Sequence, residues 1–358
     1  MTTTPDREDR RQDAPTRRTA IVRSLLPAGH DTGAHPENPR RVAAIDAELA
    51  RQGLDDGRPA VAARPAGLAA LERVHDLSYL DDLEERSLMG GRAIDPETLV
   101  LADSWEAALH AAGAALAATD AVLDGRAGAA FAIARPPGHH ARPAAGMGVC
   151  LLNNAAVAAA HALHRGLDRV LVLDWDAHHG NGTQEIFYAS DRILYVSLHQ
   201  SPLFPGTGSS AERGSGPGKG FTLNLPLPAG TGDRDYLRTF DEAAIPAIRR
   251  FRPGLILVSA GFDAHEADPL AGMLLTDDGF GALARRAAAL ASELCEDRLV
   301  AVLEGGYDPD ALGRSVAQTI RAFDGDDAPA PAPVSRSPRS GHLQAAAHGA
   351  DPERQGRA

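Results

Sequence analysis

Acidic and imidazole side chains gather in one short segment, DWDAHH at positions 174–179, directly after the apolar run Arg169–Leu173. Along an extended strand end, residues two apart point the same way, so Asp174, Asp176 and His178 can face one point. Carboxylate and imidazole groups at this spacing are typical ligands of zinc or manganese. So dense a set of charges beside a buried strand is costly unless the charges are paired or bound to a metal. The segment therefore predicts a metal site.

A third carboxylate follows another apolar run. Asp263 comes shortly after Leu255–Ser259, and a lone aspartate in a loop would be interpreted as a turn residue. Beside Asp176 and His178, however, it completes a set of two aspartates and one histidine. Such a set leaves one coordination position open for water and substrate, as catalytic zinc requires.

Three further apolar runs end in residues that could take part in chemistry. One leads into RPPGHH, in which the prolines stiffen the turn that projects His139 and His140; a solvated surface pair is the alternative interpretation. Another leads into EGGY, which ends at Tyr307, and a tyrosine that only caps a loop is the alternative. A third leads into Ser197 and Leu198, where a structural turn is the simpler interpretation.

The elements that must position these residues alternate along the chain. Strands are expected at 19–25, 129–134, 169–173, 193–198, 255–259 and 299–303, and helices at 39–51, 103–123, 154–165, 233–250, 277–295 and 310–323. Strands that are apolar throughout are buried on both faces, and their alternation with helices indicates a mostly parallel sheet covered on both sides. We therefore predict a single open three-layer α/β/α domain with its site beyond the carboxyl ends of the strands.

The composition sets limits on location and partners. The 358 residues carry a formal net charge of −12, which disfavours nucleic acid as a partner. The polar start of the chain is not expected to be a signal peptide, and no apolar run has the length of a membrane span. Two cysteines indicate a reducing, cytoplasmic setting rather than a disulfide framework. We expect disorder at 1–18, a catalytic domain over 19–323 and a disordered tail rich in alanine and proline at 324–358.

Seven motifs in this order resemble the zinc-dependent histone deacetylases and their bacterial relatives, the acetylpolyamine amidohydrolases and histone deacetylase-like amidohydrolases. They are HPENPRR (35–41), RPPGHHA (135–141), GVCLLNNAAVAA (148–159), LDWDAHHGNGTQ (173–184), SLHQSPLFPGTG (197–208), SAGFDAH (259–265) and EGGY (304–307). The similarity is to the class II branch and covers nearly the whole predicted domain. It implies the open α/β/α fold that these enzymes share with arginases.

The resemblance also implies roles for the candidate residues. It makes Asp176, His178 and Asp263 the ligands of one catalytic zinc ion, His139 and His140 an acid–base pair, and Tyr307 the group that binds the substrate carbonyl. It further implies a structural potassium ion. The residues at that ion would be Asp174, which also supports His139, together with Ser197, Leu198 and the backbone of Asp176 and His178.

The substrate tunnel is where this sequence departs from the family pattern. The family's two aromatic walls correspond to Phe204 and to Val149, which follows Gly148 and replaces a phenylalanine. The residue that supports the second histidine of the pair in this family corresponds to Asn181, and an asparagine is usual there in class II. The remaining tunnel positions are Leu270, where the polyamine-selective animal enzyme has a glutamate, and Asp95, which is our candidate for the aspartate that grips the substrate.

These features together predict a zinc-dependent deacylase. Its substrate could be acetyl-lysine in a protein, an acetylated polyamine or another small N-acylated amine. A manganese hydrolase of the ureohydrolase type would need more ligands, and an acyl-amine-binding protein with little catalysis is the non-enzymatic alternative. Relatives form dimers and tetramers, so a homo-oligomer is one possible state of this protein.

Overall fold

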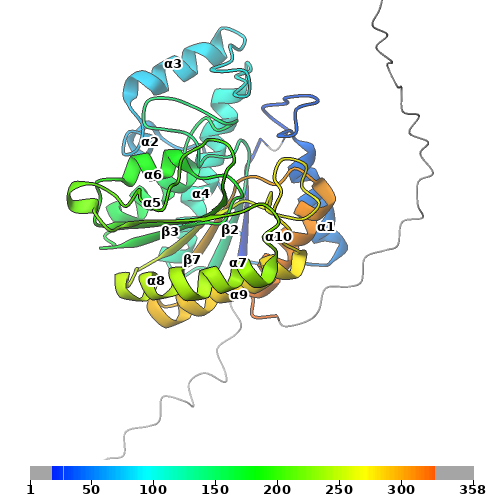
Figure 1. The fold of residues 1–358 in the computed structure, drawn as a ribbon. Helices are drawn as coiled ribbons and strands as arrows, with labels where there is room; N and C mark the ends of the chain where they lie inside the picture. Colours follow the sequence, from blue (N-terminus) through cyan, green and yellow to red (C-terminus); the bar gives the residue numbers. More distant parts are fainter. Residues whose placement is uncertain (1–17, 27, 327–358) are drawn as a thin grey trace, which may run out of the picture. The chain divides into compact units, whose positions relative to one another are not determined.

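A computed structural model describes residues 18–26 and 28–326, and these form a sheet with helices on both faces (Figure 1). The segments expected to be disordered lie outside the described residues, apart from Arg18 and residues 324–326. At this boundary the Thr19 amide donates a 2.7 Å hydrogen bond to Asp324. The Asp324 carboxylate also forms a buried ion pair with Arg58, at 2.8 Å.

The sheet has seven strands, all parallel, in the order β1-β2-β7-β6-β3-β4-β5. The strands are β1 (Ala20–Arg23), β2 (Ala129–Ile133), β3 (Val170–Asp174), β4 (Ile193–Gln200), β5 (Thr222–Leu227), β6 (Ile256–Ala260) and β7 (Leu299–Leu303). The six expected strands all form within the sheet, which confirms the predicted fold class. The seventh, β5, was not expected because its sequence TLNLPL contains a proline, and a proline is tolerated because β5 lies at the edge of the sheet.

The six expected helices also form, although one is interrupted. The helices are α1 (Arg40–Arg51), α2 (Leu68–Leu71), α3 (Leu77–Leu88), α4 (Ser104–Leu123), α5 (Asn154–His164), α6 (Asn181–Phe187), α7 (Asp233–Thr239), α8 (Ile245–Phe251), α9 (Asp277–Leu294) and α10 (Pro309–Phe323). The stretch expected as one helix at 233–250 consists of α7, a π-helical turn (Phe240–Ala244) and α8. Within the described ranges, no helix has the length and apolar character needed to cross a bilayer.

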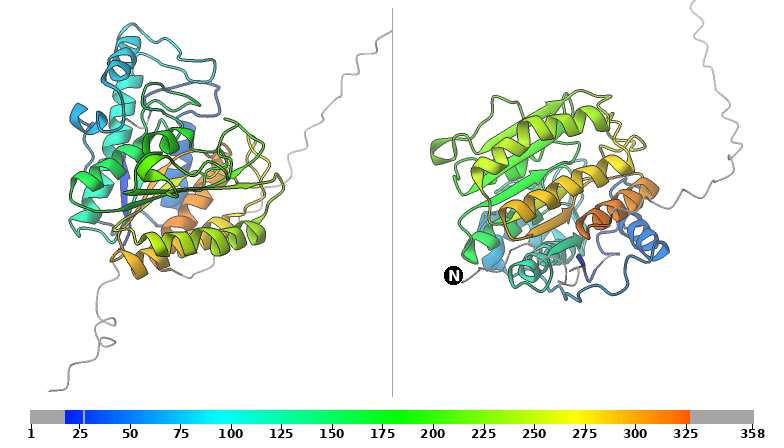
Figure 2. Two further views of the ribbon diagram at one scale, coloured as in Figure 1. Left: turned by 60° about the vertical axis from the view of Figure 1, so that its left-hand side comes forward. Right: turned by 90° about the horizontal axis from the view of Figure 1, so that it is seen from below.

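The helices cover the sheet unequally (Figure 2). One face packs against α4 and α5 through a cluster rich in alanine, whereas the other packs against α1 and α7–α10 through leucine, isoleucine and phenylalanine. Strand β3 shows how one strand contributes to both clusters, because successive side chains point to opposite faces of the sheet. Val170 and Val172 belong to the first cluster, and Leu171 and Leu173 belong to the second. Residues before α4 and those of α2 and α3 add a third cluster on the α4–α5 side.

Four neighbouring strands, β2, β7, β6 and β3, carry the segments that contain the candidate catalytic and metal-binding residues. Because these strands are parallel, the segments that follow them all emerge at the same edge of the sheet. The chain reaches this arrangement by passing from β2 to β3 over two positions that β6 and β7 fill later. Such a change in strand order is where open α/β sheets place their ligands.

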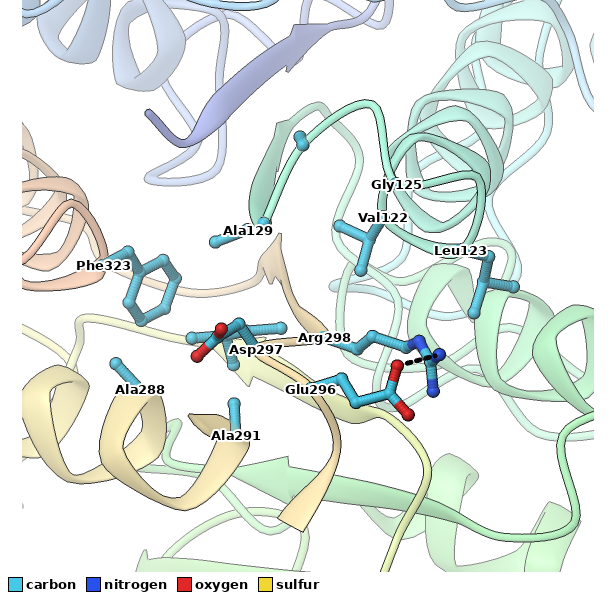
Figure 3. Close-up of a pocket in the computed structure, with 13 residues that line it drawn as sticks. Val122, Leu123, Gly125, Ala129, Ala288, Ala291, Glu296, Asp297, Arg298 and Phe323 are labelled. Carbon is cyan, nitrogen blue, oxygen red and sulfur yellow. Dashed lines mark hydrogen bonds and ion pairs between the residues drawn. The ribbon is translucent and has the colours of Figure 1, made fainter. Parts of the chain in front are cut away.

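A cavity of about 610 Å³ lies at the opposite edge (Figure 3). Its lining includes Ala129 and Leu299, the first residues of β2 and β7, together with Val122 and Phe323 near the ends of α4 and α10. The ion pair between Glu296 and Arg298, at 2.9 Å, crosses part of it. The cavity is therefore separate from the carboxyl-edge residues that the sequence singles out.

Candidate metal centre and active site

Asp176, His178 and Asp263 converge as the sequence predicts. One potential ligand atom from each lies within 4.8 Å of the others. Nδ1 of His178 is 2.9 Å from Oδ2 of Asp263 and 3.2 Å from Oδ1 of Asp176. Both carboxylates are buried, and the imidazole is nearly so. Two carboxylates and one imidazole directed at one point form a suitable donor set for a zinc ion with an open coordination position.

Backbone amides hold the other carboxylate oxygens in place. The Gly305 amide donates to Oδ2 of Asp176 at 2.9 Å, and the Ala177 amide donates to Oδ1 of Asp263 at 2.7 Å. Gly305 must be a glycine for this approach, because a Cβ there would lie 2.3 Å from Oδ2 of Asp263 and 2.7 Å from Oδ2 of Asp176. Hydrogen bonds of this kind fix the orientation of metal ligands.

The electrostatics of the three residues favour a bound cation. Burial and the neighbouring Asp176 raise the pKa of Asp263 to about 7. Burial opposes a charge on His178, yet Asp263 and Asp176 raise the pKa of its ring to about 11. The cluster therefore concentrates negative charge that must be neutralised, either by a proton on His178 or by a metal ion.

The adjacent His139 and His140 have different hydrogen-bond partners. Their ring centroids are 4.0 Å apart. Nδ1 of His139 lies 3.1 Å from Oδ2 of Asp174, whereas Nδ1 of His140 lies 2.8 Å from the amide oxygen of Asn181. Burial opposes a charge on His139, but Asp176 and Asp174 raise its pKa to about 10. Burial and the adjacent His139 hold the pKa of His140 well below its usual value of 6.5.

Asp174 is the centre of a buried hydrogen-bond network. Its Oδ2 also accepts from the Tyr195 hydroxyl at 2.9 Å, and its Oδ1 accepts from the Asp176 amide at 3.2 Å. Asp174 pairs in register with Ser197 on β4, and the Ser197 hydroxyl lies 2.8 Å from Nδ1 of His199. The Leu198 carbonyl accepts from the Tyr236 hydroxyl at 3.2 Å. Of the residues expected at a potassium ion, Asp174 thus lies on β3 and Ser197 and Leu198 lie on the neighbouring β4.

Tyr307 is held on both sides of its peptide group. Its amide donates to Oδ2 of Asp268 at 2.6 Å, and the preceding carbonyl, of Gly306, accepts from Nε of Arg41 at 2.7 Å. The Arg41 guanidinium also lies over the Tyr307 ring, 5.1 Å from its centroid. Burial raises the pKa of Tyr307 well above 10, so its hydroxyl remains a hydrogen-bond donor at neutral pH.

Phe204 makes an aromatic contact beside the histidine pair. The ring of Phe204 is 45% exposed and packs edge-on against His140, with 5.1 Å between ring centroids. Gly148 makes this possible, because a Cβ there would lie 2.7 Å from the His140 ring and 2.9 Å from the Phe204 ring. Gly148 and Phe204 thus both lie beside His140.

Val149 is unusual because its φ is 63°, which a β-branched residue rarely adopts. Its amide donates to the Thr98 hydroxyl at 3.3 Å, and that hydroxyl donates to Oδ2 of Asp95 at 3.0 Å. Oδ1 of Asp95 accepts from the amides of Glu97 and Thr98. The carboxylate that we expected to grip substrate therefore supports the loop beside Val149.

The tunnel candidate Leu270 and the two neighbours of Val149 differ in exposure and contacts. Leu270 is 42% exposed, and its amide donates to Asp268. Leu151 is fully buried in the third cluster, and the Met147 sulfur lies 3.5 Å from the amide nitrogen of Asn181. The two side chains that could have filled the space next to Val149 thus have other contacts.

Sequence reasoning missed the side chain of Glu304, although it opens the EGGY motif. This buried carboxylate accepts from the amides of Gly138 and His139 at 2.6 and 3.1 Å, and from the Ser259 hydroxyl at 3.3 Å. Burial raises its pKa to about 7. Its backbone carbonyl accepts from Arg41. Glu304 thereby joins the turn that carries the histidine pair to the strand that precedes Asp263.

The comparisons with known proteins agree with this geometry. The histone deacetylase domain matches residues 35–323. The chain belongs to the histone deacetylase family. A probable deacetylase of Archaeoglobus fulgidus is 45% identical over 296 residues, which cover 82% of this chain and 82% of that protein. A histone deacetylase-like amidohydrolase of Pseudomonas aeruginosa is 44% identical over 276 residues, which cover 76% of this chain and 72% of that protein.

A solved structure shows the same fold for a histone deacetylase family member. The HDA15 HD domain superposes with a TM-score of 0.81 at 36% identity, covering 87% of this chain and 90% of that one. The similarity therefore spans both faces of the sheet rather than the motifs alone. As a histone deacetylase family protein, the chain is a hydrolase of the deacetylase and amidohydrolase type.

Proposed function

We propose that the protein hydrolyses N-acyl amides, above all acetyl amides, of lysine-like side chains or small amines, with one zinc ion held by Asp176, His178 and Asp263. The convergence of these three residues beside the histidine pair is the observation that supports the proposal most strongly. Zinc bound there would polarise the acyl carbonyl and acidify a water molecule. The donor set is too small for the two metal ions of a manganese ureohydrolase, which favours a single zinc.

His140 is suited to act as the general base. Because the Asn181 amide oxygen only accepts hydrogen bonds, Nδ1 of His140 carries the proton and Nε2 is left free to accept one. The low pKa of His140 keeps this ring neutral, as a base must be. Nε2 would take a proton from the attacking water and return it to the leaving amine. His139, charged beside Asp174, would supply a fixed positive charge.

Tyr307 is suited to stabilise the charge that develops on the acyl oxygen. Its hydroxyl stays protonated, and its peptide is held by Asp268 and Arg41. A preorganised donor of this kind is typically worth a factor of about 10² to 10³ in turnover. Phe204 and Gly148 would guide the acyl-amine stem past His140.

The first test joins turnover to metal content. Purified full-length protein should hydrolyse a fluorogenic acetyl-lysine amide and contain about one zinc per chain, the stoichiometry of a single three-ligand site. Asp263→Ala should lose most of the zinc and the activity. Asp278→Ala, an exposed aspartate at the start of α9, is the matched control and should keep both. Full zinc occupancy in Asp263→Ala would remove Asp263 from the metal site, and an inactive wild type that binds acyl-amines would favour a binding protein instead.

The second test concerns the hydroxyl of Tyr307. Tyr307→Phe should lower kcat by at least about a hundredfold, because one oxyanion donor is removed. Zinc content and unfolding temperature should stay unchanged, since the ring and its contact with Arg41 remain. Turnover close to that of the wild type would show that another group stabilises the acyl oxygen.

The same proposal extends to the substrate class, a potassium ion and the cellular compartment. We propose acetyl-lysine, acetylpolyamines and other N-acylated amines as the substrate class to screen, with no nucleic acid or membrane partner. Two buried free cysteines suit a reducing cytoplasm. A potassium ion near Asp174, Ser197 and Leu198 would have a structural role, which activity measured in sodium and in potassium buffers would test.

A further inference from the structure

Asp268 lies on the loop between β6 and α9 and is buried, with only 8% of the residue exposed. Its Oδ1 accepts from the amide of Leu270, two residues later, at 2.9 Å. Taken alone, that bond is an ordinary turn of the kind that aspartate favours. The other oxygen makes a bond that a turn does not explain, because Oδ2 accepts from the amide of Tyr307, 39 residues away, at 2.6 Å.

The Asp268–Tyr307 bond acts on a peptide that is otherwise held from one side. Arg41 binds the carbonyls of Gly306 and Glu304 and lies over the Tyr307 ring. These contacts fix the segment before Tyr307, and Asp268 fixes the amide of Tyr307 itself. After Tyr307 the chain continues into α10, whose N-terminus is capped by Asp308 through the Ala311 amide at 2.8 Å. The bond to Asp268 therefore holds the amide side of the peptide from which the tyrosine side chain projects, opposite the side that Arg41 holds.

We propose that Asp268 is a positioning residue for Tyr307: its carboxylate holds the Tyr307 peptide so that the hydroxyl meets the acyl oxygen, and it ties this peptide to the turn at Leu270. The inference rests on the proposed role of Tyr307 in acyl-amide hydrolysis. A displacement of about 1 Å in a catalytic group can cost a hundredfold in rate, so one hydrogen bond at the backbone is enough to matter.

Asp268→Ala removes both acceptor oxygens and is the principal variant. Its kcat should fall by about tenfold or more, while KM should change by less than about twofold, because Tyr307 acts in the transition state. In a Tyr307→Phe background the same substitution should change kcat by less than about twofold, since the group that Asp268 positions is already gone. Asp268→Asn keeps one acceptor oxygen, and its loss should be intermediate.

A second readout does not depend on turnover or on the metal. In metal-free full-length protein, hydrogen exchange at the Tyr307 amide should be slow in the wild type and faster in Asp268→Ala. Asp308→Asn is the matched control at the neighbouring position, because asparagine caps helices about as well as aspartate. It should leave both kcat and the exchange of Tyr307 unchanged.

The outcomes separate this proposal from the proposed function. Equal losses of kcat in the wild-type and Tyr307→Phe backgrounds, or unchanged exchange at the Tyr307 amide, would overturn the role of Asp268. A wild type without hydrolytic activity would overturn the proposed function, and the exchange experiment would still decide whether Asp268 holds Tyr307.

Discussion

Asp174 and Asn181 differ by one group of similar size and are the Nδ1 partners of two adjacent imidazoles whose pKa values shift in opposite directions. Against the effect of burial, Asp176 and Asp174 raise the pKa of the His139 ring, whereas burial and the adjacent His139 lower the pKa of His140. Two identical side chains thereby acquire an electrostatic role and a basic role. This division is set by burial and by the charges around each ring: Asp176 and Asp174 around His139, and His139 itself beside His140.

At Val149 the side chain and the backbone conformation both bear on substrate choice. Two aromatic walls would hold a slim acyl-amine stem well, and we propose that Val149 stands in place of one wall, while Met147 and Leu151 have other contacts. We expect a weaker preference for acetyl over bulkier acyl groups than a relative with phenylalanine shows. Val149→Phe should sharpen that preference, measured as the ratio of kcat/KM for an acetyl and a bulkier acyl substrate.

Val149→Leu serves as the control for this prediction. Leucine is apolar and not β-branched, so it shares any relief of backbone strain at φ 63° but supplies no ring. The ratio should change in Val149→Phe and stay near the wild-type value in Val149→Leu. The same ratio in all three proteins would mean that Val149 does not shape the tunnel.

Among the elements, the four residues after β7 form hydrogen bonds to three other segments of the site. Glu304 binds the turn of the histidine pair, Gly305 binds Asp176, and Tyr307 binds Asp268. Each bond reaches a segment that follows or precedes a different strand of the sheet. The segment 304–307 therefore helps to set the relative positions of the proposed metal ligands and the proposed catalytic groups.

Gly305→Ala tests this arrangement. A Cβ at this position would lie 2.3 Å from Oδ2 of Asp263, so the carboxylates must move apart, and zinc content and turnover should both fall by at least about tenfold. Gly281→Ala in α9 is the matched control, because its Cβ would have only ordinary contacts of 3.4 Å or more and alanine favours helix. It should keep zinc and unfold at the same or a higher temperature. Normal zinc binding in Gly305→Ala would show that the cluster tolerates expansion.

The elements also show what the sequence could and could not predict. Apolar runs predicted the central strands, and residues after them predicted the metal cluster, because parallel strands bring their carboxyl ends to one edge. The edge strand β5 was not predicted because Pro226 breaks the apolar pattern. The roles of Asp268 and Glu304 were not predicted because both carboxylates bind amides far away in the chain. The spacing of residues in a short segment does not indicate a hydrogen bond between distant loops.

The molecule as a whole contains a buried neutral histidine that links two regions of the α4–α5 side. Nδ1 of His75 lies 3.0 Å from the Arg142 carbonyl, and Nε2 accepts from the Asn153 amide at 2.9 Å. Burial lowers the pKa of His75 to about 4. The unfolded chain binds a proton at His75 below about pH 6.5, whereas the folded protein does so only near pH 4. The stability that the neutral ring contributes is thus present above pH 6.5 and is lost as the pH falls towards 4.

His75→Asn isolates this contribution. The unfolding free energy of the wild type exceeds that of the variant, and the difference should shrink by about 2 kcal/mol between pH 7 and pH 5. Urea unfolding of both proteins at the two pH values measures it, and other titrating groups cancel in the comparison. A difference that stays constant with pH would mean that His75 is protonated in the folded protein at pH 5.

The bond between the Thr19 amide and Asp324 brings the first strand and the residues after the last helix together. Thr19 directly precedes β1, so this junction lies at the amino edge of the sheet, whereas Asp176 and Tyr307 follow strands at the carboxyl edge. A surface or carrier attached at Thr19 or Asp324 would therefore lie at the edge of the sheet opposite the proposed active site. The same proximity makes the described part of the chain suited to circular permutation, with Thr19 and Asp324 joined by a short linker and new ends opened in an exposed loop.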